Sequence, residues 1–198
     1  MAWAPDYVTD VELKAYLRIS DTGDDAELAV VATASSRAID LHTNRQFGKV
    51  AAAEQRLYTA RYDHERCRWV IDIDDLMTTT DLVILVGGVA LTDYVKEPVN
   101  AAAKGRPWTR LVVDKDSAVV PTGEEYEVAG TAIWGWTAVP NSVKLAARLQ
   151  ASRFHSRRDS PYGIAGSPDA GSEMRLLSRV DPDVGVSLRS FVRPRAVA

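Results

Sequence analysis

The sequence predicts an α+β protein: a small α-helical bundle of about four helices with an inserted antiparallel β sheet or barrel-like subdomain. Apolar residues recur with helical spacing before residue 50 and after residue 139. The segment between them is rich in β-branched and aromatic residues, with turn signals about every ten residues. The helices at both ends must meet to bury their apolar stripes. We therefore expect residues 1–49 and 140–198 to form a helical base, and residues 50–139 to form a β-rich insertion.

The first helix is predicted to follow Thr9. Glu12 stands three residues later, which is the spacing of a capping box, in which each residue bonds the other's backbone N–H. Leu13, Tyr16 and Leu17 recur on one side of this helix and are expected to form its apolar stripe.

The second helix is predicted over residues 24–43. Asp24, Asp25 and Glu27 lie at its start, where the helix dipole favours negative charge. Several members of its apolar stripe are small, so another helix could approach closely. The stripe consists of Leu28, Val31, Ala32, Ser35, Ala38 and Ile39.

Five runs in the middle of the chain are predicted to be strands, because they are rich in β-branched and aromatic residues. Turn residues such as Gly87 and Gly88 separate them. The runs cover residues 54–61, 67–74, 81–88, 110–114 and 125–136.

The third helix is predicted over residues 139–158, with Pro140 in its first turn. Its apolar surface is wider than one stripe, which indicates burial on two sides, one of them against another subunit. One stripe consists of Val143, Ala147, Gln150 and Phe154, and the other of Leu145 and Leu149.

The last helix is predicted to begin with Asp181 as its N-cap and Pro182 in its first position. Its apolar face is expected to consist of Val184, Leu188, Phe191 and Val192.

Composition and charge bound the class of protein. The chain has 198 residues, one cysteine and a net charge of −3. Residues 1–140 hold 14 Lys and Arg against 22 Asp and Glu, whereas residues 141–198 hold 10 against 5. A single cysteine cannot form an internal disulfide, and no apolar run is long enough to span a membrane. We therefore expect a protein made in the cytoplasm, without a membrane partner, whose C-terminal part meets something acidic.

The sequence contains no recognisable catalytic or cofactor-binding pattern. His42 is interpreted as structural, and Cys67 as a small apolar side chain at the start of a strand. Asp72 and Asp74 share one face of a predicted strand, a spacing that could hold a hard cation, but we favour an acidic strand end. We therefore expect no enzyme, no cofactor and no metal site.

The segment RFHSRRDSPYGIAG, residues 153–166, allows two interpretations. Arg153, Arg157 and Arg158 lie about one helical turn apart, so they could present one face to nucleic-acid phosphates. They could equally complement the dipole at a helix C-terminus. The overall pI of about 5.6 is far from the basic footprint of a dedicated nucleic-acid binder. A nucleic-acid-binding regulatory module remains the alternative function.

Four segments, in the same order, resemble a known family. YVTDVELKAYLRI and DDAELAVVATASSRAIDLHTNRQFG resemble the N-terminal half of tailed-phage head–tail connector proteins, also called adaptor or head-completion proteins. VPNSVKLAARLQASRFHSRRDSPYGIAG resembles their third helix and the loop after it, and RVDPDVGVSLRSFVR resembles their last helix. EYEVAGTAIWGWTAVP is similar to the strand before that third helix in long members with a β insertion.

The resemblance implies a structural virion protein of the bacteriophage neck, without enzymatic activity. Such adaptors form an oligomeric ring, commonly dodecameric, beneath the portal protein at the vertex through which the viral genome is packaged and ejected. The ring extends the DNA channel, close to the genomic DNA, and docks the downstream neck or tail-completion protein.

The site residues are predicted on this basis. The end of the third helix and the loop after it are expected to dock to the portal or to a neighbouring subunit, together with part of the last helix. The predicted docking residues are Arg153, Arg157, Arg158, Asp159, Ser160, Pro161, Tyr162, Gly163, Phe191 and Arg193. Asp24, Asp25 and Glu27 are the candidates to face the channel lumen.

Overall fold

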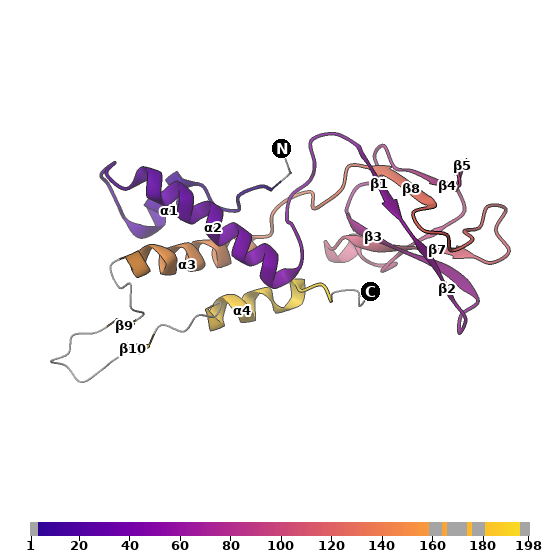
Figure 1. Cartoon of the computed structure of the whole chain (residues 1–198). Helices are drawn as coiled ribbons and strands as arrows, with labels where there is room; N and C mark the ends of the chain where they lie inside the picture. The colour runs from indigo at the N-terminus through magenta and orange to yellow at the C-terminus, as the bar shows by residue number, and fades with distance from the viewer. Residues whose placement is uncertain (1–3, 159–163, 166–173, 176–180, 195–198) are drawn as a thin grey trace. The chain divides into compact units, whose positions relative to one another are not determined.

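The structure is a computed structural model that describes residues 4–158, 164–165, 174–175 and 181–194 (Figure 1). It confirms the predicted α+β class, with four α-helices and two four-stranded antiparallel sheets. The described strands close neither sheet into a barrel, so the insertion contains open sheets rather than a barrel. The chain divides into a helical unit, residues 1–47 and 139–198, and a β unit, residues 48–138.

The first two helices are α1, Asp10–Leu17, and α2, Asp25–Thr43. The predicted capping box is confirmed: the Glu12 amide donates to Thr9 Oγ1 over 3.1 Å, and the Thr9 amide donates to Glu12 Oε2 over 3.2 Å. The apolar stripe of α1 is narrower than predicted, because Leu13 is buried while Tyr16 is exposed.

The remaining helices are α3, Asn141–Arg158, and α4, Pro182–Leu188, which continues as the 3-10 turn η3, Arg189–Phe191. The predicted cap of α4 is confirmed, since the Asp181 carboxylate accepts from the Asp183 amide. Pro140 lies just before α3 rather than in its first turn, and its carbonyl accepts from two amides of that turn. Helix α3 packs against α1, α2 and α4, while Leu145 of the second predicted stripe is exposed.

Helices α2 and α3 make the most extensive helix contact in this unit, and each of them buries several small side chains. The hydroxyls of Ser35 and Ser36 donate to the Ala32 carbonyl, so these buried polar groups are satisfied within α2 itself. Side chains of this size allow two helix backbones to lie close together. The buried small residues are Ala32, Ser35 and Ser36 on α2, and Ala146, Ala147 and Ala151 on α3.

One sheet of the β unit has the strand order β1-β8-β4-β5, and the other has the order β2-β3-β7-β6. The first contains β1 Glu54–Tyr58, β8 Val128–Ala132, β4 Val83–Val86 and β5 Val89–Ala90. The second contains β2 Ala60–Asp63, β3 Arg68–Leu76, β7 Trp108–Asp114 and β6 Val95–Glu97. A 3-10 turn, η1, covers Ala102–Lys104. The helical unit holds one further antiparallel pair, β9 Ile164–Ala165 with β10 Met174–Arg175.

The predicted run 54–61 is divided between the two sheets. Thr59 alone separates β1 from β2, so one extended segment contributes an edge strand to each sheet. Strands β5 and β6 were not predicted, because two or three residues carry no readable periodicity. The buried apolar side chains of both sheets form the core of the unit, among them Ile71, Ile73, Leu111, Ile84, Val128 and Trp134.

The two ends of the β unit are held together by backbone hydrogen bonds. The Val50 amide donates to the Trp134 carbonyl over 3.0 Å, and the Trp136 amide donates to the Gly48 carbonyl over 2.7 Å. The buried Asp75 carboxylate then accepts from the indole N–H of Trp136 over 2.7 Å. The point where the chain enters this unit is thereby fixed beside the point where it leaves.

Gly135 makes this closure possible. Its φ is +108°, a region that residues with a side chain rarely adopt. A Cβ added at Gly135 would lie 2.1 Å from the Gly48 carbonyl oxygen, far inside van der Waals contact. Two backbones can therefore cross here only if this residue has no side chain.

We expect Gly135→Ala to destabilise the protein by about 3 kcal/mol or more, because it combines backbone strain with a steric clash. The matched control is Gly87→Ala, at a glycine whose φ is also positive but whose added Cβ would meet no atom within 4 Å. It should cost about 1 kcal/mol, from strain alone. Urea denaturation measures both. If both variants lose the same free energy of unfolding, the close approach of the two backbones at Gly135 does not add to the cost.

Candidate docking surfaces

The basic end of α3 lies beside the N-terminal ends of two other helices. Arg158 contacts Asp24, the residue before α2, with one nitrogen 2.6 Å and a second 3.4 Å from the two carboxylate oxygens. Arg153 lies 3.8 Å from Asp181, the N-cap of α4. The C-terminal end of α3 therefore meets the first residues of α2 and α4, and α3 runs antiparallel to both.

These contacts distribute the predicted docking arginines over different sides of α3. Arg153 turns towards α4 and Arg158 towards α2, while Arg157 is half-buried. The arginines therefore do not form the single phosphate-facing surface that the nucleic-acid interpretation requires. The hydrogen bonds from Arg158 hold the pKa of Asp24 below its ordinary value. Because this pair is exposed, it contributes little to stability.

Two of the three predicted lumen-facing acids are paired with basic side chains. Asp24 is paired with Arg158, and Asp25 lies 2.6 Å from the amino group of Lys14. Glu27 is exposed. The negative charge at the start of α2 is therefore partly neutralised within the same chain, and Glu27 is the most open of the three carboxylates.

Phe191 and Arg193 lie at the other end of the helical unit. The Phe191 ring is only 8% exposed and meets the Phe47 ring edge-on, with centroids 5.7 Å apart. The Arg193 amide donates to the Thr43 carbonyl at the end of α2. The structure therefore does not bring these two residues together with the arginines of α3. Phe191 contributes its ring to the core, so it offers a partner little surface.

The remaining predicted docking residues lie outside the part of the chain that the structure describes. They are Asp159, Ser160, Pro161, Tyr162 and Gly163.

The outer side of α2 carries an apolar stripe that the sequence analysis did not single out. Ala26, Val30, Ala34 and Leu41 follow one another at helical spacing, and all four are exposed. Leu41 is 76% exposed. The signal was present in the sequence, since α2 has apolar residues on more than one side. Such a stripe is suited to contact with a partner.

The outer face of the β1-β8-β4-β5 sheet is also apolar. The strand register places Leu57, Ala129, Leu85 and Ala90 side by side, one from each strand. Leu57 is 55% exposed. The adjoining row consists of Gln55, Thr131 and Val83, so neither row contains a charged residue. A solvated sheet face normally carries polar side chains, so this face is suited to contact with another protein surface.

The candidate chemical groups are engaged in structural contacts. Asp74 accepts from Arg56 over 2.8 Å and from the Tyr58 hydroxyl over 3.1 Å, while Asp72 accepts from Arg110 over 2.9 Å. Among the described residues, no group of three or more His, Cys, Asp and Glu side chains could hold a metal ion.

The interpretation of Cys67 was wrong. The thiol is exposed, and the residue has a φ of +51° in the turn between β2 and β3. The apolar strand position begins only at the next residues, since a tight turn has to precede β3.

No helix in the described part of the chain is long and apolar enough to cross a membrane. No protein-family model matches the sequence, and no curated protein matches it.

A buried polar cluster anchors the N-terminal segment beside the end of α2. The Tyr7 hydroxyl donates a short hydrogen bond to Asp40 and accepts from the Phe47 amide over 2.9 Å. Arg37 lies 3.3 Å from Asp40 and donates to the Pro5 carbonyl. The Asp40 side chain is 13% exposed. Burial raises its pKa from the ordinary 3.8 to about 6, although Tyr7 and Arg37 act in the opposite direction.

This cluster predicts a pH dependence of stability. The folded state holds the Asp40 proton more tightly than the unfolded state, so the free energy of unfolding should fall as the pH rises from 4 to 6. At about 1.4 kcal/mol per pKa unit, the contribution of this side chain is about 3 kcal/mol. Asp40→Asn removes the titration, so the variant should gain stability relative to the wild type over this range.

Chemical denaturation at pH 4, 5, 6 and 7 measures the difference. Asp21→Asn is the matched control, because Asp21 is an exposed acid of the helical unit, which accepts a hydrogen bond from the Gly23 amide. A difference between Asp40→Asn and wild type that stays constant from pH 4 to pH 7 would show that Asp40 does not titrate there.

Proposed function

We propose that this protein is a structural virion protein, a head-to-tail adaptor. In this proposal, copies of the chain form a ring beneath the portal, extend the DNA channel and dock the next neck or tail protein. The helical unit supplies the base of each subunit, and the β unit supplies an additional surface. The protein acts by shape and contact rather than by chemistry on a substrate.

The observation that carries the proposal is the exposed apolar surface of both units. The stripe of α2, with Val30 and Leu41, and the uncharged sheet face around Leu57 each require a partner. The resemblance in four ordered segments to head–tail connectors specifies what kind of partner to expect. A second copy and a portal ring are the partners that this family uses.

The nucleic-acid alternative receives less support from the contacts. Arg153 and Arg158 point towards aspartates of α4 and α2, and those carboxylates repel phosphates. A filter-binding titration with duplex DNA at two salt concentrations separates the two functions. Phosphate binding predicts an affinity that falls steeply with salt.

Portal binding tests the proposal directly. We expect the combined substitution of Arg157, Arg158 and Tyr162 by alanine to weaken binding to portal rings by about tenfold or more, as loss of an anchoring cluster does. The exposed Arg189 on η3 provides the control Arg189→Ala, which should leave binding unchanged. A pull-down with purified portal rings measures this. Wild-type protein that fails to bind the rings would remove the adaptor proposal.

Assembly tests the α2 stripe separately. Val30→Asp together with Leu41→Asp places two charges on the exposed apolar face without disturbing the core, so we expect folding to be kept and ring formation to be lost. Val186→Asp on α4 is the control, because Val186 is also an exposed apolar residue of this unit. Light scattering of each protein, alone and with portal rings, reports the assembled mass. Rings of unchanged mass would rule out a role of α2 between subunits.

A further inference from the structure

The outer face of the β2-β3-β7-β6 sheet contains a hollow of about 320 Å³. Four arginines line it, together with a tyrosine, an aspartate, a histidine and a valine. They are Arg61, Arg66, Arg68, Arg110, Tyr62, Asp63, His64 and Val70. A hollow of this size is at the lower end of the range for ligand pockets in proteins. It is therefore large enough to hold a side chain or two from a partner.

Carboxylates position three of these arginines. Asp72 accepts from Arg110 over 2.9 Å and lies 3.3 Å from Arg61. Arg68 lies 3.1 Å from Glu97, on the edge strand β6, and 3.8 Å from Asp63 at the end of β2. Each guanidinium has five N–H donors, so such contacts orient the group and still leave donors for a ligand.

Arg66 differs from the other three arginines. It is exposed, and its side chain makes no hydrogen bond or ion pair with the residues that the structure describes. The hollow therefore offers one unpartnered cation at its rim and the half-buried aromatic residue Tyr62 in its lining, whereas Val70 is already buried. A carboxylate next to an apolar or aromatic group fits this combination.

The same unit carries such a group on the loop formed by residues 121–127. The Glu127 carboxylate accepts from the amides of Thr122 and Gly123 over 2.9 and 2.7 Å, which holds the loop closed. Partial burial acts to raise the pKa of Glu127, but these hydrogen bonds outweigh it and lower the pKa. The Tyr126 amide donates to the Thr59 hydroxyl over 3.1 Å. The loop is therefore rigid before it meets a partner.

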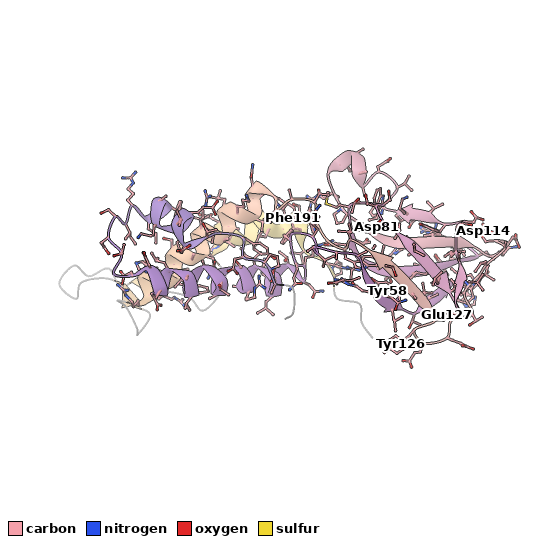
Figure 2. All side chains as sticks on the ribbon, turned by 90° about the horizontal axis from the view of Figure 1, so that it is seen from above. Tyr58, Asp81, Asp114, Tyr126, Glu127 and Phe191 are labelled. Atoms are coloured by element: carbon pink, nitrogen blue, oxygen red, sulfur yellow. The ribbon has the colours of Figure 1, made fainter. Side chains whose placement is uncertain are left out.

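The Tyr126 side chain projects from this loop. Its φ is +58°, which is unfavourable for a bulky residue, and it is 61% exposed. Figure 2 labels Tyr126 at the edge of the β unit. Glu124 and Glu125 precede it, and both are exposed. Together these residues form a knob, Glu124, Glu125 and Tyr126, with two carboxylates beside one aromatic ring. A strained and exposed aromatic residue is typical of a functional surface.

The knob and the hollow lie on opposite faces of the sheet. Val70 and Arg68 share the face of the hollow, because alternate residues of a strand point the same way. Trp69, between them, points to the other face. Gly123 of the loop lies against the Trp69 ring, since an added Cβ would be 3.4 Å from it. One subunit can therefore present its knob to one neighbour and its hollow to another.

We infer that the knob of one protomer inserts into the arginine hollow of a second copy of this chain. The Glu124 and Glu125 carboxylates face the arginines, and the Tyr126 ring meets the half-buried Tyr62 of the lining. Such a contact joins two different surfaces, which generates rings or filaments rather than closed dimers. The inference deepens the proposed ring assembly, on which it rests for its biological setting, by naming a contact between β units.

A second copy fits the hollow better than nucleic acid does. The carboxylates of Asp63, Asp72 and Glu97 beside the arginines would repel a long chain of phosphates, whereas a knob with only two charges can be met by the exposed guanidiniums of Arg61 and Arg66. Each copy also carries one knob and one hollow, so the two are present in equal number wherever copies assemble.

Site-directed cross-linking tests the contact in the full-length chain. In a Cys67→Ser background, one chain carries Glu125→Cys and a second carries Arg66→Cys, both at exposed positions. Mild oxidation of the mixture should give at least about tenfold more cross-linked dimer than either chain alone, because only the mixture brings knob and hollow cysteines together. The matched control replaces Arg66→Cys by Lys104→Cys, another exposed basic position of the β unit.

Charge reversal provides the second measurement. For this measurement the cysteines are placed at neighbouring positions, Glu124→Cys on the knob and His64→Cys in the hollow. Glu125→Arg alone, or Arg66→Glu alone, should lower the yield of this cross-link. The yield should recover when a chain with Glu125→Arg is mixed with a chain with Arg66→Glu, or when one chain carries both, since opposite charges meet again. Restoration is not expected if the substitutions act only within one chain.

Each outcome decides the inference. Equal yields from the Arg66→Cys and Lys104→Cys mixtures, or a cross-link between two Glu125→Cys chains alone, would overturn it. So would duplex DNA binding that Arg66→Glu abolishes, because the hollow would then serve nucleic acid. If the protein binds portal rings but does not form this cross-link, the knob contact is ruled out and the adaptor proposal stands. If it forms the cross-link but does not bind portal rings, the knob contact stands and the adaptor proposal is ruled out.

Discussion

The β unit depends on one close approach of two backbones. The helical unit places the end of α2 near the start of α3, because the two helices are antiparallel, so the segment between them must begin and end at neighbouring points. The hydrogen bonds between residues 48–50 and 134–136 meet that requirement. Only glycine fits at position 135, and the buried pair of Asp75 and Trp136 supports the crossing from the adjacent strand. The β unit can therefore be inserted between α2 and α3 while those two helices stay in contact.

The helical unit is held differently at its two ends. At the end formed by the start of α2, an exposed ion pair joins Arg158 to Asp24, and a partly buried one joins Lys14 to Asp25. At the other end, aromatic rings and buried polar groups meet, with Phe47 between Tyr7 and Phe191. Exposed ion pairs are weak and sensitive to salt, whereas buried aromatic contacts are neither. The end with the ion pairs is therefore the one that a charged partner can rearrange at little cost.

The two sheets of the β unit present outer faces of opposite character. One is uncharged, with Leu57 and Val83 exposed, and the other carries arginines with their carboxylate partners. In a single copy the apolar side chains of the first face stay exposed to water, which is unfavourable. The arginines of the second face keep N–H donors that their carboxylate partners do not use. Together with the stripe of α2, this distribution fits the proposed role of a subunit whose surfaces meet other molecules.

The sequence by itself determined the elements whose signals are local. The capping box of Thr9 and Glu12, the Asp181 cap and the helical periodicities depend on residues a few positions apart, so they could be read directly. The antiparallel insertion followed from its β-branched runs. Only the tertiary structure decided the strand order, the division at Thr59, the crossing at Gly135 and the separation of Phe191 from Arg158. These depend on which distant segments meet, and a pattern in one segment carries no information about its partner.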